Sequence, residues 1–96
     1  MRLFRRRPTV DLYTTPNCAD CAAVKRYLNA HGVAYREKDV TVDAAHLEEM
    51  KRVAGVRIAP VVVVAGNAFY GTFENQRARL AAALEAAGLM KERDAS

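Results

Sequence analysis

The chain has 96 residues, of which 51% are hydrophobic, and a formal net charge of +4. This length and composition predict one domain that buries its own core without help from a metal or disulfides, so both of its cysteines are available for chemistry. No run approaches the roughly 18 apolar residues of a membrane span, and charged residues stand where a secretory signal has its apolar stretch, so we expect a cytoplasmic protein that does not associate with membranes.

Much of the positive charge lies in the first residues, MRLFRRR. Four arginines gather there: Arg2, Arg5, Arg6 and Arg7. Such a run is usually solvated, and we therefore interpret residues 1–8 as a basic tail. Binding to nucleic acid is the weaker interpretation, because this tail is the only feature that supports it.

The first half of the chain alternates strand and helix patterns. Residues 9–14 (TVDLYT) are rich in β-branched and aromatic residues, which favours a strand, and residues 33–41 (VAYREKDVT) show a second strand pattern. Between them the pattern is helical, because Cys21, Val24 and Leu28 recur at spacings of three and four.

The second half predicts a helix, two strands and another helix. Asp43 is expected to cap a helix that ends at Gly55. The apolar stripe of this helix consists of Leu47, Met50, Val53 and Ala54. Residues 60–66 (PVVVVAG) contain four consecutive valines, as expected of a central strand covered on both faces. A short strand at residues 68–71 and a last helix from about residue 75 to residue 87 complete the pattern.

This order, βαβ followed by ββα, predicts an α/β fold. The connection between the first two strands crosses over in the right-handed sense, and the valine-rich strand lies inside the sheet, so helices cover both faces of four strands. We expect a single domain over residues 9–88 and a polar tail over residues 89–96.

The stretch TTPNCADC holds both cysteines, Cys18 and Cys21, in a C-x-x-C arrangement. A closed zinc site needs four ligands, and the chain offers only His31 and His46 besides, at spacings unlike those of standard zinc motifs, so we assign no metal ligand. A structural disulfide is also disfavoured, because so short a loop constrains the unfolded chain little. We therefore interpret the cysteines as a redox-active pair and keep a zinc-binding interaction module as the alternative from another class of function.

A redox role has a physical basis in the predicted helix. With Asn17 as the N-cap, Cys18 would occupy the first helical position, where free backbone N–H groups and the helix dipole stabilise a thiolate. Cys18 is therefore expected to attack a substrate disulfide, and Cys21, one turn further, to attack the resulting mixed disulfide. Asp20 is expected to stabilise the first helical turn, and the alternative is that its carboxylate opposes the charge of the thiolate.

Several stretches resemble a known family. LYTTPNCADC, a helix, and then RIAPVVVVAG resemble the glutaredoxin-like branch of the thioredoxin superfamily, from about Thr9 to Gly88. The resemblance implies a thioredoxin fold, βαβ-ββα, with a four-stranded mixed sheet flanked by three helices. It also implies a thiol–disulfide oxidoreductase that reduces protein disulfides or glutathione mixed disulfides.

The resemblance implies roles for residues outside the cysteine pair. Pro60 matches a cis-proline that packs beside the sulfur atoms, and Ala59 before it matches a residue whose backbone pairs with the substrate. Arg57 matches a position where glutathione-using members carry arginine or glutamine, and Thr15 stands where they carry lysine. Two further positions, in a turn that holds the γ-glutamyl end of glutathione through backbone N–H groups, are Gly71 and Thr72.

The source of electrons stays open between two alternatives. Glutathione is a candidate reductant, although the absent lysine and an absent second glycine remove family contacts to it. The alternative is an NrdH-type redoxin, which is reduced by thioredoxin reductase and supplies electrons to ribonucleotide reductase. We expect no bound cofactor, because the dithiol itself carries both electrons. Nothing in the sequence specifically indicates an iron–sulfur cluster bridging two copies, and we expect a monomer.

Overall fold

The computed structural model describes residues 8–90. In chain order its elements are β1 (Val10–Thr14), α1 (Ala19–Ala30), β2 (Arg36–Asp39), α2 (Ala44–Ala54), β3 (Val61–Val64), β4 (Asn67–Tyr70) and α3 (Phe73–Ala86). The strands form one sheet in the order β2-β1-β3-β4, with β2 parallel to β1 and the other neighbours antiparallel. The predicted βαβ-ββα order and the four-stranded mixed sheet with its three helices are confirmed.

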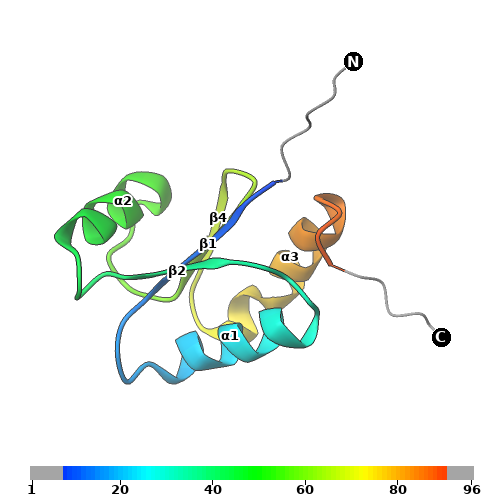
Figure 1. The fold of residues 1–96 in the computed structure, drawn as a ribbon, viewed down its shortest axis with the longest axis horizontal. Coiled ribbons are helices and arrows are strands. Elements are labelled where there is room, and N and C mark those ends of the chain that lie inside the picture. Colours follow the sequence, from blue (N-terminus) through cyan, green and yellow to red (C-terminus); the bar gives the residue numbers. More distant parts are fainter. Residues whose placement is uncertain (1–7, 91–96) are drawn as a thin grey trace, which may run out of the picture.

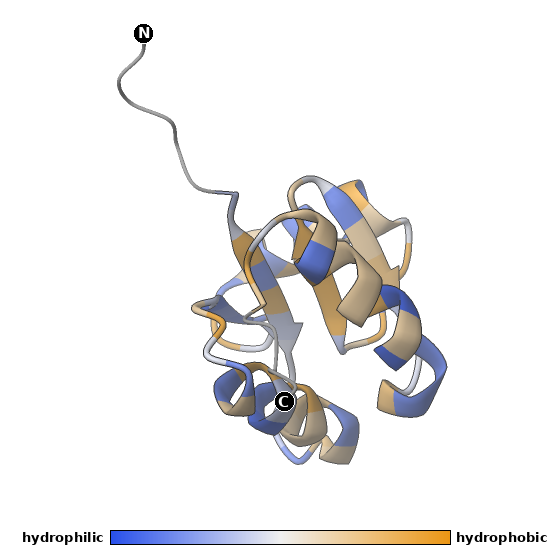
Figure 2. Ribbon diagram, turned by 90° about the vertical axis from the view of Figure 1, so that its right-hand side faces the viewer, coloured by the Kyte–Doolittle hydropathy of each residue, from blue (hydrophilic) through white to orange (hydrophobic). Residues whose placement is uncertain are grey.

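The helices cover both faces of the sheet (Figure 1). α1 and α3 pack on one face, where Leu28 and Leu84 join Val62 in a buried cluster. α2 lies on the other face, where Met50 packs against Tyr13 and Val61. Because β3 contributes side chains to both cores, its valines need not alternate with polar residues, as predicted. Figure 2 shows hydrophobic residues concentrated on part of the sheet, whereas the helices carry both hydrophobic and hydrophilic residues; β2 is itself charged throughout.

The strand register brings several loops to one edge of the sheet. β1 ends at Thr14, which pairs with Asp39 at the end of β2. Tyr13 pairs with Val61, the first residue of β3, and Val61 pairs in turn with Tyr70, the last residue of β4. The loop from β1 to the cysteines, the loop that enters β3 and the turn into α3 therefore meet at the same edge.

Two elements differ in length from the prediction. β2 covers Arg36–Asp39 rather than residues 33–41, because Val33 packs into the core before the chain begins to pair with β1. α3 begins at Phe73, about two residues earlier than expected, because the Thr72 side chain already caps the helix. Both differences arise from tertiary or capping contacts that compete with the local pattern.

The two ends of α2 match the sequence prediction, but one residue of its predicted buried face does not. The Asp43 carboxylate accepts a hydrogen bond from the Ala45 N–H at 2.9 Å, and Gly55 ends the helix in a left-handed conformation, so both predicted ends are confirmed. The assignment of Val53 to the buried stripe is wrong, because Val53 is 41% exposed. The other predicted members of the stripe do face the sheet: Met50 is fully buried, and Leu47 and Ala54 pack against its cluster.

The packed part of the chain extends past the last helix. Leu89 and Met90 lie against the core, and the Leu89 N–H donates to the Leu84 carbonyl at 2.9 Å. Core contacts therefore continue two residues beyond the predicted domain boundary at residue 88. The arginines of the basic tail and residues 91–96 of the polar tail lie outside the described residues. None of the helices found in residues 8–90 is both long and apolar enough to span a bilayer.

A polar network on the α2 side depends on the charge of Glu49. Its carboxylate accepts hydrogen bonds from the Lys38 ammonium at 2.6 Å and the Tyr13 hydroxyl at 2.7 Å, and these bonds hold the pKa of Glu49 below its ordinary value of 4.5. The Glu49 carboxylate therefore binds a proton less tightly in the folded chain than in the unfolded chain. The resulting stability is present above about pH 4.5 and is lost as the pH falls through the lower pKa of the folded state.

We expect Glu49→Gln to lower the free energy of unfolding by about 1 kcal/mol at neutral pH, and by less in acid where the native carboxyl is also protonated. Thermal unfolding of both proteins at neutral pH and near pH 3 measures the difference. Glu48→Gln is the matched control, because Glu48 is 65% exposed and its pair with Lys51 contributes little. An equal loss at both pH values would contradict a role for the charge.

Candidate active site

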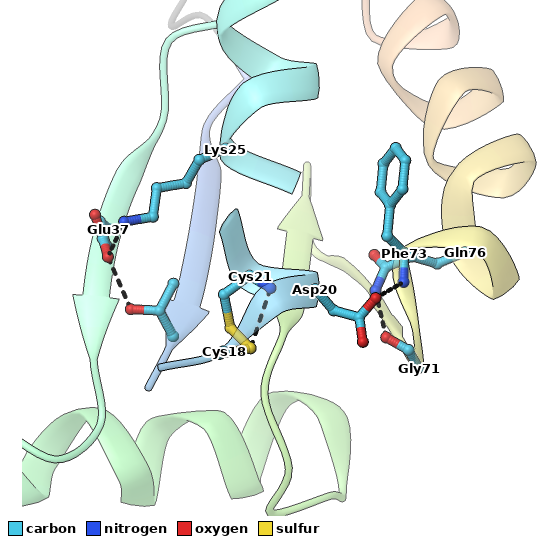
Figure 3. Close-up of a disulfide and its surroundings, with 9 residues drawn as sticks. Cys18, Asp20, Cys21, Lys25, Glu37, Gly71, Phe73 and Gln76 are labelled. Carbon is cyan, nitrogen blue, oxygen red and sulfur yellow. Dashed lines mark hydrogen bonds and ion pairs between the residues drawn. A yellow bond between two sulfur atoms is a disulfide. The ribbon is translucent and has the colours of Figure 1, made fainter. Parts of the chain in front are cut away.

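Cys18 and Cys21 lie at the start of α1, after the loop that leaves β1 (Figure 3). Cys18 is the N-cap of the helix, and its Sγ accepts a hydrogen bond from the Cys21 N–H at 3.0 Å. The prediction that Asn17 caps the helix is wrong, because Asn17 adopts a left-handed conformation (φ 56°) instead of the extended one that an N-cap needs. The prediction that Cys18 is the first helical residue is wrong for the same reason: it is the N-cap, and its sulfur itself accepts from an N–H group of the first turn that has no partner within the helix.

The two cysteines form a disulfide and differ in exposure. Their Cα atoms are 5.2 Å apart. Cys21 is only 2% exposed, whereas Cys18 is half-buried. An incoming thiolate can therefore reach Cys18 and is kept from Cys21, so the sulfurs are placed for different steps of an exchange reaction.

A cavity of about 340 Å³ opens beside the disulfide, between the cysteine loop and the end of β2. Lys25 and Glu37 line it, together with Thr15 and Asp39. The Lys25 ammonium lies 2.9 Å from a Glu37 carboxylate oxygen, and the buried Thr14 hydroxyl donates to the same oxygen at 2.9 Å (Figure 3). The bond from Lys25 is the main reason why the pKa of Glu37 is lowered. One wall of the cavity is therefore charged at neutral pH.

Sequence reasoning did not identify this charged wall. Lys25 belongs to α1 and Glu37 to β2. Within its own helix or strand, each is most simply interpreted as a charged residue that faces solvent. Only the crossover from α1 into the parallel strand beside β1 brings them together. The residue pattern within a single helix or strand gives no indication of an ion pair with a different element.

Asp20 contacts a second helix. It lies in the first turn of α1, as expected, but its Oδ1 accepts a hydrogen bond from the Phe73 N–H at 3.0 Å, at the first residue of α3 (Figure 3). The carboxylate thus joins the cysteine helix to the N-terminus of α3. Sequence reasoning missed this contact because the two residues are 53 positions apart and an acid in a first turn already has a local explanation.

The turn between β4 and α3 is held from inside the fold. Gln76 is fully buried, and its side-chain amide donates to the Gly71 carbonyl at 3.1 Å. Gly71 has a φ of 108°, a conformation that other residues rarely adopt. The sequence signal that could have identified Gln76 is its spacing of four from Leu80, which in turn is four from Leu84, so that all three share the buried face of α3.

The structure places the expected substrate-contacting residues around this edge, but not in one cavity. Thr15 lines the cavity beside the cysteines. Pro60 is buried and follows a cis peptide bond from Ala59, in the loop that enters β3, and Arg57 is exposed in the same loop. The two remaining positions form the turn before α3: Gly71 and Thr72. None of the residues in this loop or this turn lines the cavity.

The histidines do not join the cysteines in a cluster. Within residues 8–90, no three His, Cys, Asp or Glu side chains gather in an arrangement that could hold a metal ion. His31 packs on the ring of Tyr27, with centroids 4.6 Å apart, and His46 Nδ1 lies 3.2 Å from the Asp39 carbonyl oxygen.

Fold and site together define a thioredoxin-fold protein with a cysteine pair at a helix N-terminus. The family model for Glutaredoxin matches residues 10–69, which is more than half of the chain. The chain therefore belongs to the glutaredoxin family.

Individual relatives lead to the same family. The glutaredoxin-like protein NrdH of Lactococcus lactis subsp. cremoris is 32% identical over 72 residues, which span 75% of this chain and 99% of that protein. A glutaredoxin of Neisseria meningitidis serogroup B is 37% identical over 67 residues, 68% of this chain and 76% of that protein. The crystal structure of the thioredoxin-like protein BC3987 superposes with a TM-score of 0.68 at 32% identity, covering 75% of this chain and 99% of that one. The protein is thus glutaredoxin-like, with a redox C-x-x-C pair.

Proposed function

We propose that this protein is a thiol–disulfide oxidoreductase that reduces protein disulfides or mixed disulfides between proteins and glutathione. The observation that supports this most strongly is the accessible Cys18 at the N-cap of α1, next to the buried Cys21. A thiolate on Cys18 is stabilised by the Cys21 N–H and by the helix dipole. Cys21 is shielded from substrate and serves to resolve the intermediate.

The proposed cycle moves two electrons and two protons. The Cys18 thiolate attacks one sulfur of the substrate disulfide, that S–S bond breaks, and the released substrate sulfur takes a proton from solvent. Cys21 then loses its proton and attacks Cys18 Sγ, so the second substrate sulfur leaves as a thiolate, takes up a proton, and the Cys18–Cys21 disulfide forms. The dithiol supplies both electrons, so the proposed cycle uses no metal and no bound cofactor.

The substrate would lie across the edge at which the loops meet. We propose that Pro60 shapes this groove and that the Ala59 backbone pairs with an extended substrate segment. The register supports this, because the start of β3 lies at the same edge as the end of β1. Further contacts are proposed for Thr15, Arg57, Gly71 and Thr72.

A second candidate is the NrdH-type redoxin, which would be reduced by thioredoxin reductase and would donate electrons to ribonucleotide reductase. The similarity to the Lactococcus lactis NrdH favours it, because that match spans 99% of the relative's length. The lack of a lysine at Thr15 is consistent with a partner other than glutathione.

The two candidates are separated by their electron donor. The oxidised protein is offered, in separate reactions with NADPH, either glutathione with glutathione reductase or thioredoxin reductase alone, and the loss of NADPH absorbance is followed in the presence of a disulfide substrate. Turnover only with glutathione supports the ordinary glutaredoxin, and turnover only with thioredoxin reductase supports the NrdH-type redoxin. If neither system sustains turnover, the proposed function is wrong.

A further inference from the structure

The N-terminus of α3 lies beside the cysteine helix and already holds a carboxylate. Backbone N–H groups at a helix N-terminus attract anions. Here the Phe73 N–H donates to Asp20 Oδ1 at 3.0 Å, and the Asn75 N–H donates to the Thr72 hydroxyl at 3.0 Å. Side chains of the protein therefore occupy N–H groups that the carboxylate of a ligand would otherwise use.

Further negative charge faces the disulfide from the other side. Glu37 and Asp39 line the cavity next to Cys18, and hydrogen bonds hold the pKa of each below its ordinary value, from Lys25 for Glu37 and from Thr41 for Asp39. Lys25 offsets one of these two charges. A carboxylate-bearing molecule that approaches the accessible sulfur is thus repelled from the cavity as well as from the α3 side.

We infer that Asp20 is a specificity-determining residue, which takes the place of a ligand carboxylate at the N-terminus of α3 and disfavours thiols and disulfides that carry carboxylates. Glutathione, with two carboxylates and one ammonium group, belongs to the disfavoured class, and neutral or cationic partners are accepted in preference. This inference rests on the proposed function, because it concerns the substrate class of the same cysteine pair.

Reduction of the Cys18–Cys21 disulfide by small thiols of different charge measures the effect of Asp20 on thiol selectivity. The thiolate attacks Cys18 Sγ, the Cys18–Cys21 bond breaks, and Cys21 leaves as a thiolate that takes a proton from solvent. A second thiol molecule attacks the mixed disulfide, releases Cys18 and is itself oxidised to the small-molecule disulfide. A neutral thiol reports the intrinsic reactivity of the protein disulfide, whereas an anionic thiol also experiences the charge of Asp20.

The experiment compares three monothiols, glutathione, neutral 2-mercaptoethanol and cationic cysteamine, on the oxidised wild type and on Asp20→Ala and Asp20→Asn. Reactions are quenched with acid, free cysteines are labelled with a maleimide, and labelled protein is counted by mass spectrometry. We expect the ratio of the glutathione rate to the 2-mercaptoethanol rate to rise roughly tenfold in Asp20→Ala at low salt. In the same variant, the ratio of the cysteamine rate to the 2-mercaptoethanol rate should fall.

Asp20→Asn separates charge from hydrogen bonding. Its amide oxygen can still accept the Phe73 N–H, so the glutathione ratio should rise, but by less than in Asp20→Ala, where the N–H is freed. This variant also keeps the test valid if Asp20→Ala unfolds, which circular dichroism would reveal. Asp43→Asn is the matched control, because it removes the same charge from the N-cap of α2, on the other face of the sheet, and should leave every ratio unchanged.

A glutathione ratio that stays within about twofold of wild type in both Asp20 variants would overturn the inference. The proposed function fails on a different result, namely inability of the reduced wild type to reduce insulin disulfides. The thiol ratios can be measured in either case, because they need only the oxidised cysteine pair.

Discussion

Cys18→Ser is expected to reduce disulfide-reductase activity at least about 1000-fold. Serine can still cap α1 by accepting the Cys21 N–H, so the fold of the variant should be retained. Its hydroxyl, however, is not ionised near neutral pH and cannot form a mixed disulfide. The measurement is the rate of insulin reduction with dithiothreitol as electron donor, corrected for the rate without protein.

Cys21→Ser provides the matched control for this prediction. It keeps the attacking sulfur and loses the resolving one, so a mixed disulfide with the substrate should accumulate and be visible by mass spectrometry. In the reduced wild type, iodoacetamide should alkylate Cys18 before Cys21, because Cys21 is 2% exposed. Retention of more than about a tenth of the wild-type activity in Cys18→Ser would contradict the assigned role.

Leu28→Ala is expected to have the largest effect on stability, lowering the free energy of unfolding by about 2–5 kcal/mol. Leu28 is fully buried on α1 and belongs to the cluster between α1, α3 and the sheet, so its truncation leaves a cavity beneath the helix that carries the disulfide. Urea unfolding of the wild type and variant, both oxidised, gives the difference.

Ile58→Ala is the control for the truncation itself. Ile58 is 74% exposed, so removing its side chain should change the free energy of unfolding by less than about 0.5 kcal/mol. If Leu28→Ala cost no more than this control, the packing of α1 would not depend on the buried cluster as described.

Features with a local cause were predictable from the sequence. Asp43 and Gly55 bound α2 as expected, because capping and chain reversal depend on the residue itself. The valines of β3 face both cores as expected, because a run without alternation suits only a strand covered on two sides. The cysteine pair was identifiable for the same reason, since its spacing is a property of one helical turn.

Features that depend on distant partners were not predictable. Asp20 had a sufficient local role in α1, and only the packing of α3 beside α1 reveals its bond to Phe73. The pair of Lys25 and Glu37 requires the crossover into β2. The error at Asn17 is also instructive, because a good capping residue was prevented from capping by the left-handed turn of the loop.

The direction of β1 has a practical consequence for tethering the protein. The strand has five residues and reaches the disulfide edge only at Thr14, so its first residue, Val10, is separated from that edge by about 13 Å of extended backbone. A linker joined ahead of Pro8 would hold the molecule by the opposite end of the sheet. Immobilised on an electrode or bead in this way, it would present its sulfur atoms outward, open to a macromolecular partner.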